Sequence, residues 1–366
     1  MKKSIVIISL IIFCGGSITH AQQSSEKQNE IVLYTFFFNV VPDNFNVPLV
    51  GFFNVARGNH TGLKVGFVNT TFGQFTGGQI GFVNSNIKST TGIQIGYINT
   101  SLKEFKGSQI GFVNTNLKKF VGTQIGFVNT NLKTIVGPQI GFVNTTLKDF
   151  QGSQIGFVNT AIDHSRGPQI GFVNTAAKNL EGAQIGFVNT TAGKLKGAQL
   201  GFVNYADSIE KGIPFGFLSI VRKGGFQAFE LSSNPAYPLN LSFEIGVSKL
   251  YTSFIFSCNP GTKTSYGSGM GVGTHIDLSD KLLLNIEASS ISKIGRNYYS
   301  TNQIELGVGY RLSEKISILA GVNGAHQVKS RNTESFDKPL YSLLEHEIND
   351  NNRILMGFNA GIKISL

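Results

Sequence analysis

The chain has 366 residues, a formal net charge of +10 and only 14% charged residues, whereas glycine alone fills 44 positions. Abundant Gly, Asn, Thr and Phe favour strands and tight turns, so the composition argues against a mainly helical protein. The basic charge suits acidic partners such as lipopolysaccharide or anionic glycans, but net charge says nothing about fold. The length allows two domains.

Residues 1–21 are predicted to be a secretory signal peptide. Two lysines precede a short apolar stretch, and a small residue, Ala21, ends the segment, so we expect the mature chain to begin at Gln22. Removal of this segment leaves one cysteine, Cys258, which excludes an intramolecular disulfide. The sequence therefore predicts an exported protein.

A 15-residue repeat dominates the next part of the chain. The hexapeptide Gln-Ile-Gly-Phe-Val-Asn, or a near copy, begins at Gln79, Gln94, Gln109, Gln124, Gln139, Gln154, Gln169, Gln184 and Gln199. Weaker copies extend the array to about twelve units, and a fixed short period of this kind predicts a solenoid or another repeat array. The expected segments are a signal peptide at 1–21, an N-terminal cap or linker at 22–46, the repeats at 47–223 and a second β domain at 224–366.

Each unit reads as short strands joined by turns. Strand alternation places Ile110 and Phe112 on one face, and a glycine closes the unit at Gly122. A single unit cannot bury these apolar side chains, but stacked units can, at about 4.8 Å per coil. We therefore expect a β-solenoid in which equivalent asparagines form amide ladders and Phe112, Phe127 and Phe142 stack in one buried column.

Two other arrangements of the repeat stay open. The units could form a meander of short hairpins, or they could be membrane strands of one large barrel. The second arrangement normally has loops of unequal length at its two rims, whereas these connections are all equal.

The segment 224–366 shows a different pattern, in which long runs alternate between apolar and glycine or polar residues. Eight strands are expected at 226–233, 238–248, 250–258, 268–279, 282–291, 302–312, 315–326 and 354–366. Tight turns alternate with longer polar loops, which is typical of an outer-membrane barrel with lipid outside and a polar lumen. A soluble β-sandwich is the alternative. With eight strands, both ends of the barrel lie on the short-turn side, which is usually periplasmic.

The repeated Gly-x-Gln-Ile-Gly-Phe-Val-Asn motif resembles that of envelope surface-repeat proteins of spirochaetes and Bacteroidota. The run from Gly212 to Ser219 also looks like the point where such arrays give way to a C-terminal β domain. The resemblance covers nearly half of the chain. It implies an envelope location, in the periplasm or at the cell surface, and brings no established activity or catalytic motif.

One lysine position recurs in the repeat and forms a candidate binding track for an anionic polymer. Its members are Lys88, Lys103, Lys118, Lys133, Lys148 and Lys178. Residues 49–220 hold 14 basic and 6 acidic residues, a net charge of +8. The alternative interpretation is a solvated edge that keeps rods apart.

A polar network is expected in the barrel lumen. Its predicted members are Glu244, Glu287, Glu305, Arg311 and Lys363, with His275 and Asp277 nearby. An ion-pair network filling a narrow lumen is the first interpretation. A lipid-modifying enzyme that uses His275 with a carboxylate, or a pore, are the alternatives. No metal, cofactor or nucleic-acid partner is expected, and the oligomeric state is left open.

Overall fold

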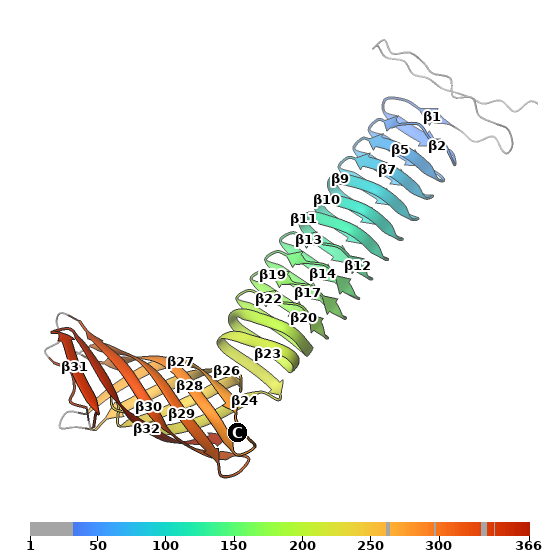
Figure 1. The fold of residues 1–366 in the computed structure, drawn as a ribbon. Coiled ribbons are helices and arrows are strands. Elements are labelled where there is room, and N and C mark those ends of the chain that lie inside the picture. The colour runs from blue at the N-terminus through green and yellow to red at the C-terminus, as the bar shows by residue number, and fades with distance from the viewer. Residues whose placement is uncertain (1–31, 261–263, 296–297, 331–334, 340) are drawn as a thin grey trace, which may run out of the picture. The chain divides into compact units, whose positions relative to one another are not determined.

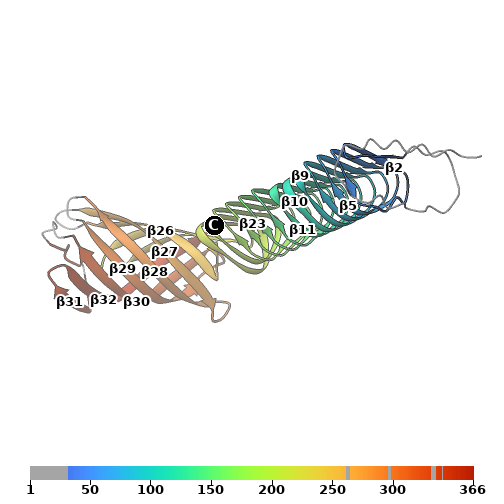
Figure 2. The ribbon, with the colours of Figure 1, turned by 90° about the horizontal axis from the view of Figure 1, so that it is seen from above.

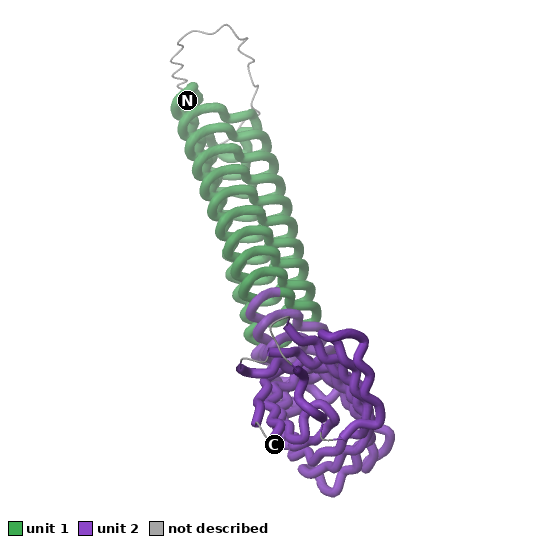
Figure 3. The backbone as a smooth tube through the Cα atoms, turned by 90° about the vertical axis from the view of Figure 1, so that its left-hand side faces the viewer, with its two compact units in different colours: residues 1–185 green, residues 186–366 purple. Residues whose placement is uncertain are grey.

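The computed structural model describes residues 32–260, 264–295, 298–330, 335–339 and 341–366. The predicted signal peptide and the first part of the predicted cap lie outside these residues. The chain divides into two compact units, 1–185 and 186–366, which are coloured separately in Figure 3. The described residues form an all-β protein with no helix, in which a solenoid precedes a closed barrel (Figure 1).

The solenoid strands lie in one sheet and pair in parallel, except that β1 pairs antiparallel with β2. Its strands are β1 Leu33–Tyr34, β2 Phe38–Val41, β3 Leu49–Val50, β4 Phe53–Ala56, β5 His60–Val65, β6 Val68–Thr71, β7 Phe75–Ile80, β8 Val83–Asn86, β9 Thr90–Ser101, β10 Phe105–Asn116, β11 Phe120–Asn131, β12 Ile135–Val136, β13 Gln139–Ile140, β14 Val143–Thr146, β15 Phe150–Gln151, β16 Gln154–Ile155, β17 Val158–Ala161, β18 Ser165–Arg166, β19 Gln169–Ile170, β20 Val173–Ala176, β21 Leu180–Glu181, β22 Gln184–Ile185 and β23 Val188–Lys223.

Every coil lies in register with the next, because each residue pairs with the residue one period later. Gln109 pairs with Gln124 and Asn114 with Asn129, both in parallel orientation. A glycine in left-handed conformation bends each coil, and a Cβ added to Gly122, whose φ is +139°, would lie 1.8 Å from the carbonyl oxygen of Gly107. The solenoid prediction is confirmed, and the hairpin meander and the single large barrel are excluded.

The interior of a coil is mostly polar. The expected asparagine ladder is present, with Asn99 donating to Asn114 and Asn114 to Asn129, but the burial of the glutamines was not expected. Gln109, Asn114, Asn116 and Phe120 are all fully buried, so only one of the four interior positions in this coil is apolar. Neighbouring glutamines bond along the axis, with Gln109 Nε2 donating to Gln94 Oε1 at 2.7 Å. Because the amides of Gln109 and Asn114 bond along the axis, the desolvation of these two side chains is compensated.

The predicted buried column of Phe112, Phe127 and Phe142 is wrong about the side of the coil. These rings do stack, with centroids 4.9 Å apart, but they lie outside and are 42%, 45% and 46% exposed. Alternation separates two faces without saying which one is inside. The asparagine fixes which face is inside: the Asn114 side chain is buried, and its Nδ2 donates to the carbonyl of Ile125 at 2.9 Å beside the bend.

The first described strands close the amino-terminal end of the solenoid. β1 pairs antiparallel with β2, and β2 already has coil geometry, since it pairs in parallel with β4. The coil pattern thus begins at Phe38, earlier than the expected boundary at residue 47. Leu49 replaces glutamine in this end coil and packs with Val41 and Ala56 in an apolar cluster.

The carboxy-terminal domain is a closed antiparallel barrel of eight strands, which confirms the predicted barrel. Figure 2 shows its strands from a second direction. The barrel strands are β24 Phe226–Ser233, β25 Leu239–Val247, β26 Leu250–Asn259, β27 Ser265–Asp277, β28 Leu282–Ile294, β29 Tyr299–Arg311, β30 Ile316–Lys329 and β32 Asn352–Ser365, with β31 Leu344–Asn349 added as a hairpin partner of β32. Pairing of β24 with β32 closes the sheet on itself.

The barrel places apolar side chains outside and polar side chains inside. On β29, Ile304 and Leu306 are 56% and 45% exposed, whereas Gln303 and Glu305 between them are 5% and 8% exposed. The short turns β25–β26, β27–β28 and β29–β30 lie at one end together with both ends of the barrel chain. The longer connections lie at the other end.

Candidate functional site

The first candidate site is a buried charge cluster around Lys363 inside the barrel. Lys363 Nζ lies 3.1 Å from Glu230 Oε2 and 2.9 Å from Glu244 Oε2, and 2.9 Å from His275 Nε2. The register explains the first pair, because Glu230 on β24 lies directly opposite Lys363 on β32. Glu230 was not predicted to be part of the lumen network, although it lies between the outward-facing Phe229 and Leu231 and so points to the inside of the barrel.

Two of the predicted interior carboxylates are satisfied by neutral groups rather than by cations. Glu287 accepts hydrogen bonds from the hydroxyls of Ser253 and Tyr251, at 2.8 and 3.1 Å. Glu305 accepts bonds from three amides at 2.9 to 3.0 Å, which belong to Asn234, Asn323 and Asn359. The predicted network is therefore three adjoining clusters within one filled interior.

Arg311 does not belong to this interior, contrary to the prediction. It is the last residue of β29, and its guanidinium is 30% exposed and pairs with Asp277 at the short-turn rim. It also donates to the carbonyl of Asp280 at 3.1 Å. A long side chain at a strand end reaches the water at the rim, which the alternation pattern alone did not reveal.

His275 is packed and not presented to a substrate. The ring is 5% exposed and its centroid lies 4.9 Å from that of Phe226 and 4.8 Å from that of Tyr251. Its Nε2 is already in contact with Lys363. His275 therefore belongs to the buried charge cluster around Lys363.

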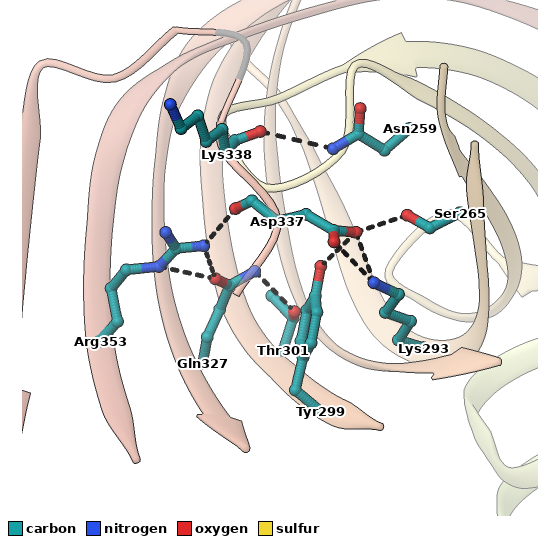
Figure 4. A network of polar contacts seen from close by, with 9 residues as sticks. All are labelled: Asn259, Ser265, Lys293, Tyr299, Thr301, Gln327, Asp337, Lys338 and Arg353. Carbon is teal, nitrogen blue, oxygen red and sulfur yellow. Dashed lines mark hydrogen bonds and ion pairs between the residues drawn. The ribbon is translucent and has the colours of Figure 1, made fainter. Parts of the chain in front are cut away.

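A short loop segment contacts side chains of the barrel strands at the long-loop end of the barrel (Figure 4). Both oxygens of Asp337 accept from Lys293 Nζ, at 2.6 and 2.7 Å, and Ser265 donates at 2.5 Å. Burial alone would raise the pKa of Asp337, but the bonds from Lys293 and Ser265 outweigh burial and the pKa is lowered. The guanidinium of Arg353 lies 4.6 Å from the ring of Phe336. We name residues 335–339 the plug segment.

The plug segment rests on an apolar layer inside the barrel. Tyr237 and Tyr299 are fully buried there with Ile291 and Leu355, and Phe336 packs against the cluster. From sequence this region is expected to be a polar loop, because the plug segment has no strand pattern and its partners are far apart in sequence. Only the folded barrel brings Asp337 to Lys293.

The lysine column lies on the bend that follows the buried asparagines, and all six predicted lysines are exposed. Five occupy consecutive coils, from Lys88 to Lys148. Asp163 takes the next place in the column and pairs with Lys178 at 2.9 Å and with Lys148 at 3.8 Å. The hydrogen bond from Lys178 lowers the pKa of Asp163. The column is therefore a five-lysine track ended by an ion pair.

Lys64 is a buried cation that the sequence analysis missed. It takes the glutamine place in its coil, is fully buried, and donates from Nζ to Thr70 O at 2.8 Å and Thr71 Oγ1 at 2.7 Å. Burial lowers its pKa to about 7. Burial and the charge of Lys64 together lower the pKa of His60 to about 4. The signal for Lys64 was its departure from the repeat consensus.

The opposite bend carries an unbroken apolar surface. We name it the Ile–Phe edge, defined by the isoleucine and phenylalanine of each Gln-Ile-Gly-Phe-Val-Asn unit and their equivalents. From Phe52 to Phe172 it presents nine aromatic rings that are 41% to 46% exposed. They are Phe52, Phe67, Phe82, Tyr97, Phe112, Phe127, Phe142, Phe157 and Phe172.

Comparison of the chain with protein-family models and with curated proteins finds no match to either. None of the described residues belongs to a helix that is long and apolar enough to cross a membrane. Within the described part of the chain, no group of His, Cys, Asp and Glu side chains is arranged to hold a metal ion.

Proposed function

We propose that the protein is an exported, non-enzymatic component of a bacterial outer membrane, in which the barrel is an anchor and the solenoid is a structural or binding module. The observation that carries the proposal is the closed eight-stranded barrel with an apolar exterior and a polar interior. This is the arrangement that places strands in lipid. Assignment to the envelope surface-repeat family belongs to the same proposal and rests on the repeat motif alone.

The height of the apolar exterior supports an outer-membrane location. On β29 the outward residues are apolar from Ile304 to Leu312, and the next one, Asn302, is polar. That stretch spans about 26 Å along the strand at about 3.3 Å per residue. For a strand tilted by about 40° this is about 20 Å of height, close to the band of about 25 Å in known barrels.

The filled interior supports an anchor over a pore. Lys363, Glu244 and Glu287 are each at most 8% exposed, and Phe336 of the plug segment packs against the buried cluster at the long-loop end. Eight strands enclose a space that side chains just fill. The packed position of His275 likewise supports a structural role over a lipid-modifying enzyme. The short turns and both barrel ends share one side, which by the usual topology is periplasmic, so the solenoid would start there.

The lysine track is a second candidate for function, as a contact for an acidic glycan or lipopolysaccharide. Five consecutive coils from Lys88 to Lys148 present exposed ammonium groups, and no carboxylate interrupts the column between them. Replacement of these five lysines by glutamine should abolish binding to an acidic glycan, and binding to the unaltered protein should weaken with salt. Binding that survives the five replacements would exclude the track.

Membrane insertion and topology can be tested together. The full chain should be extracted only by detergent and should migrate on gels at a different position after heating. The solenoid should resist protease in intact cells and be cut after the outer membrane is permeabilised. Recovery of the full chain from the aqueous fraction without detergent would refute the anchor, and cleavage in intact cells would reverse the topology.

A further inference from the structure

The Ile–Phe edge has the amphipathic character of a surface that lies on lipid. An aromatic side chain carries roughly 200 Å² of surface, so nine rings with exposures of 41% to 46% leave on the order of 800 Å² of aromatic surface in contact with solvent. The isoleucine column adds to this area. The largest apolar patch on a typical monomer is about 300–600 Å², and larger ones mark interaction sites.

The chemistry of the edge is uniform. From Val50 to Phe215 and from Phe52 to Phe217, the two columns contain no charged or amide side chain in any coil. The charged lysine column lies on the other bend. A partner that covers the whole edge therefore has to be apolar along its whole length. A protein surface that mixes polar and apolar side chains does not meet this requirement.

The ring geometry argues against a glycan as the partner. Successive rings stack face to face, with planes only 0° apart for Phe112 and Phe127 and 4° apart for Phe127 and Phe142. With centroids 4.9 Å apart, each ring covers part of the face of the next ring. Sugars need free aromatic faces for stacking, whereas hydrocarbon chains pack against C–H edges without directional demands.

Within residues 186–366 the edge runs onto the outer wall of the barrel. Phe202 stacks on Phe217 at 4.5 Å, and Phe217 meets Phe254 of β26 edge to face at 5.3 Å. Thr252, which points outward from the same strand, donates to the carbonyl of Gly216 at 2.9 Å. The apolar columns therefore join the wall that the proposed function places in lipid.

The wall beside this junction is hollowed and apolar. An open depression of about 830 Å³ is lined by Phe215 and Phe217 of the last coil and by Met270, Val272 and Ile304 of the barrel, among others. A space of this kind accepts hydrocarbon chains, and it continues the surface of the edge.

We infer that the Ile–Phe edge of the solenoid docks on the acyl layer of a phospholipid membrane. The inference rests on the proposed function, because the junction with the barrel wall is lipid-exposed only if the barrel is inserted. The edge would enter the interfacial region as the apolar side of an amphipathic helix does, while the lysine bend stays in water.

The chain contains no tryptophan, so a single introduced tryptophan reports its own surroundings. We would reconstitute full-length F127W into phosphatidylcholine vesicles with brominated acyl chains, which quench only fluorophores in contact with them. The matched control is L132W, because Leu132 is 37% exposed but lies on the lysine bend. F142W repeats the test at a second position on the edge. Heat-modifiable migration, measured on each sample, reports barrel insertion.

We expect the F127W and F142W variants to lose most of their indole fluorescence in brominated vesicles and the L132W variant to lose little. The loss should persist at high salt, because apolar contact is not screened. With an inserted barrel, equal quenching at the two bends, or none, would overturn the inference alone. If the F127W indole is buried but not quenched by brominated lipid, and the protein forms a dimer, the partner of the edge is a second copy of the chain and not lipid. Failure of the barrel to insert would overturn the proposed function.

Discussion

The asparagine ladder should stabilise the solenoid far more than the second buried amide in the same coil. Asn114 Nδ2 donates to Asn129 Oδ1 at 2.8 Å and to Ile125 O at 2.9 Å, and its Oδ1 accepts from Asn99 at 2.8 Å. Asn116 has one hydrogen bond, from Nδ2 to Lys118 O at 2.7 Å, while its Oδ1 has no partner. Both side chains are fully buried.

The two alanine variants differ in what they leave behind. N114A removes three bonds and leaves an orphaned acceptor on Asn129, and each neutral bond contributes about 1 kcal/mol, with about 1–3 kcal/mol for a buried group left unpaired. We therefore expect a loss of about 4–6 kcal/mol. N116A should cost about 1 kcal/mol or less, because alanine already fills that place in other coils, as Ala161 and Ala176.

Amide hydrogen exchange of the full chain in detergent would measure the difference coil by coil. In N114A, protection should fall in the altered coil and in the coils on either side, because each coil is stabilised by its neighbours. In N116A it should stay close to the unaltered protein. Equal loss of protection in the two variants would refute the view that the ladder, and not mere burial of asparagine, stabilises the coil.

Three further predictions concern other parts of the fold. F120A should lower the free energy of unfolding by about 3–5 kcal/mol, because Phe120 is buried inside the coil, and F127A by about 1 kcal/mol or less, because Phe127 lies outside it. Both would be measured by urea unfolding, and similar losses would contradict the assignment of Phe120 to the inside and Phe127 to the outside. The pKa of Lys64 is lowered from 10.5 to about 7 in the folded protein. Between these values the unfolded state binds more protons than the folded state, so stability should rise with pH by up to about 1.4 kcal/mol per unit toward pH 10.5. K64Q should be flat over that range, and a slope unchanged from the unaltered protein would exclude Lys64 as its source. D337N should expose the plug segment to protease, since Lys293 loses its partner. Because the pKa of Asp337 is lowered in the folded protein, the stability that Asp337 adds to the plug is present above its unfolded pKa and should disappear as pH falls through the folded value. Equal protease protection of the plug at all pH values would contradict this.

The period and the alternation predicted most of the architecture. A spacing of 15 residues with turn chemistry in each unit requires in-register stacking, and the observed pairing of Gln109 with Gln124 follows from it. In the barrel, the strand expected at 238–248 is observed at Leu239–Val247. Both signals are contained in the sequence pattern itself, so they can be recognised before the fold is known.

The interior of the coil could not be read in the same way. Burial of Gln109 and Asn114 is favourable only because identical amides lie above and below them, which is a property of the stack. An isolated unit with these residues inside would be unstable, and hydrophobicity therefore predicted the wrong side for Phe112. The plug contacts of Asp337 failed for a related reason, since they join residues that only barrel closure brings together.

The two amide ladders of the solenoid run in opposite directions. From Gln94 to Gln184 each glutamine donates toward the coil before it, as Gln124 does to Gln109. From Asn54 to Asn159 the ladder asparagines donate toward the coil after them, as Asn114 does to Asn129. Aligned amide dipoles add along a row, as peptide dipoles do in a helix, so one ladder alone would build up charge at its ends with every coil. Two opposed rows largely cancel. A rod built this way can gain or lose coils without an electrostatic penalty at its ends, so the number of repeats is free to vary while the fold stays the same.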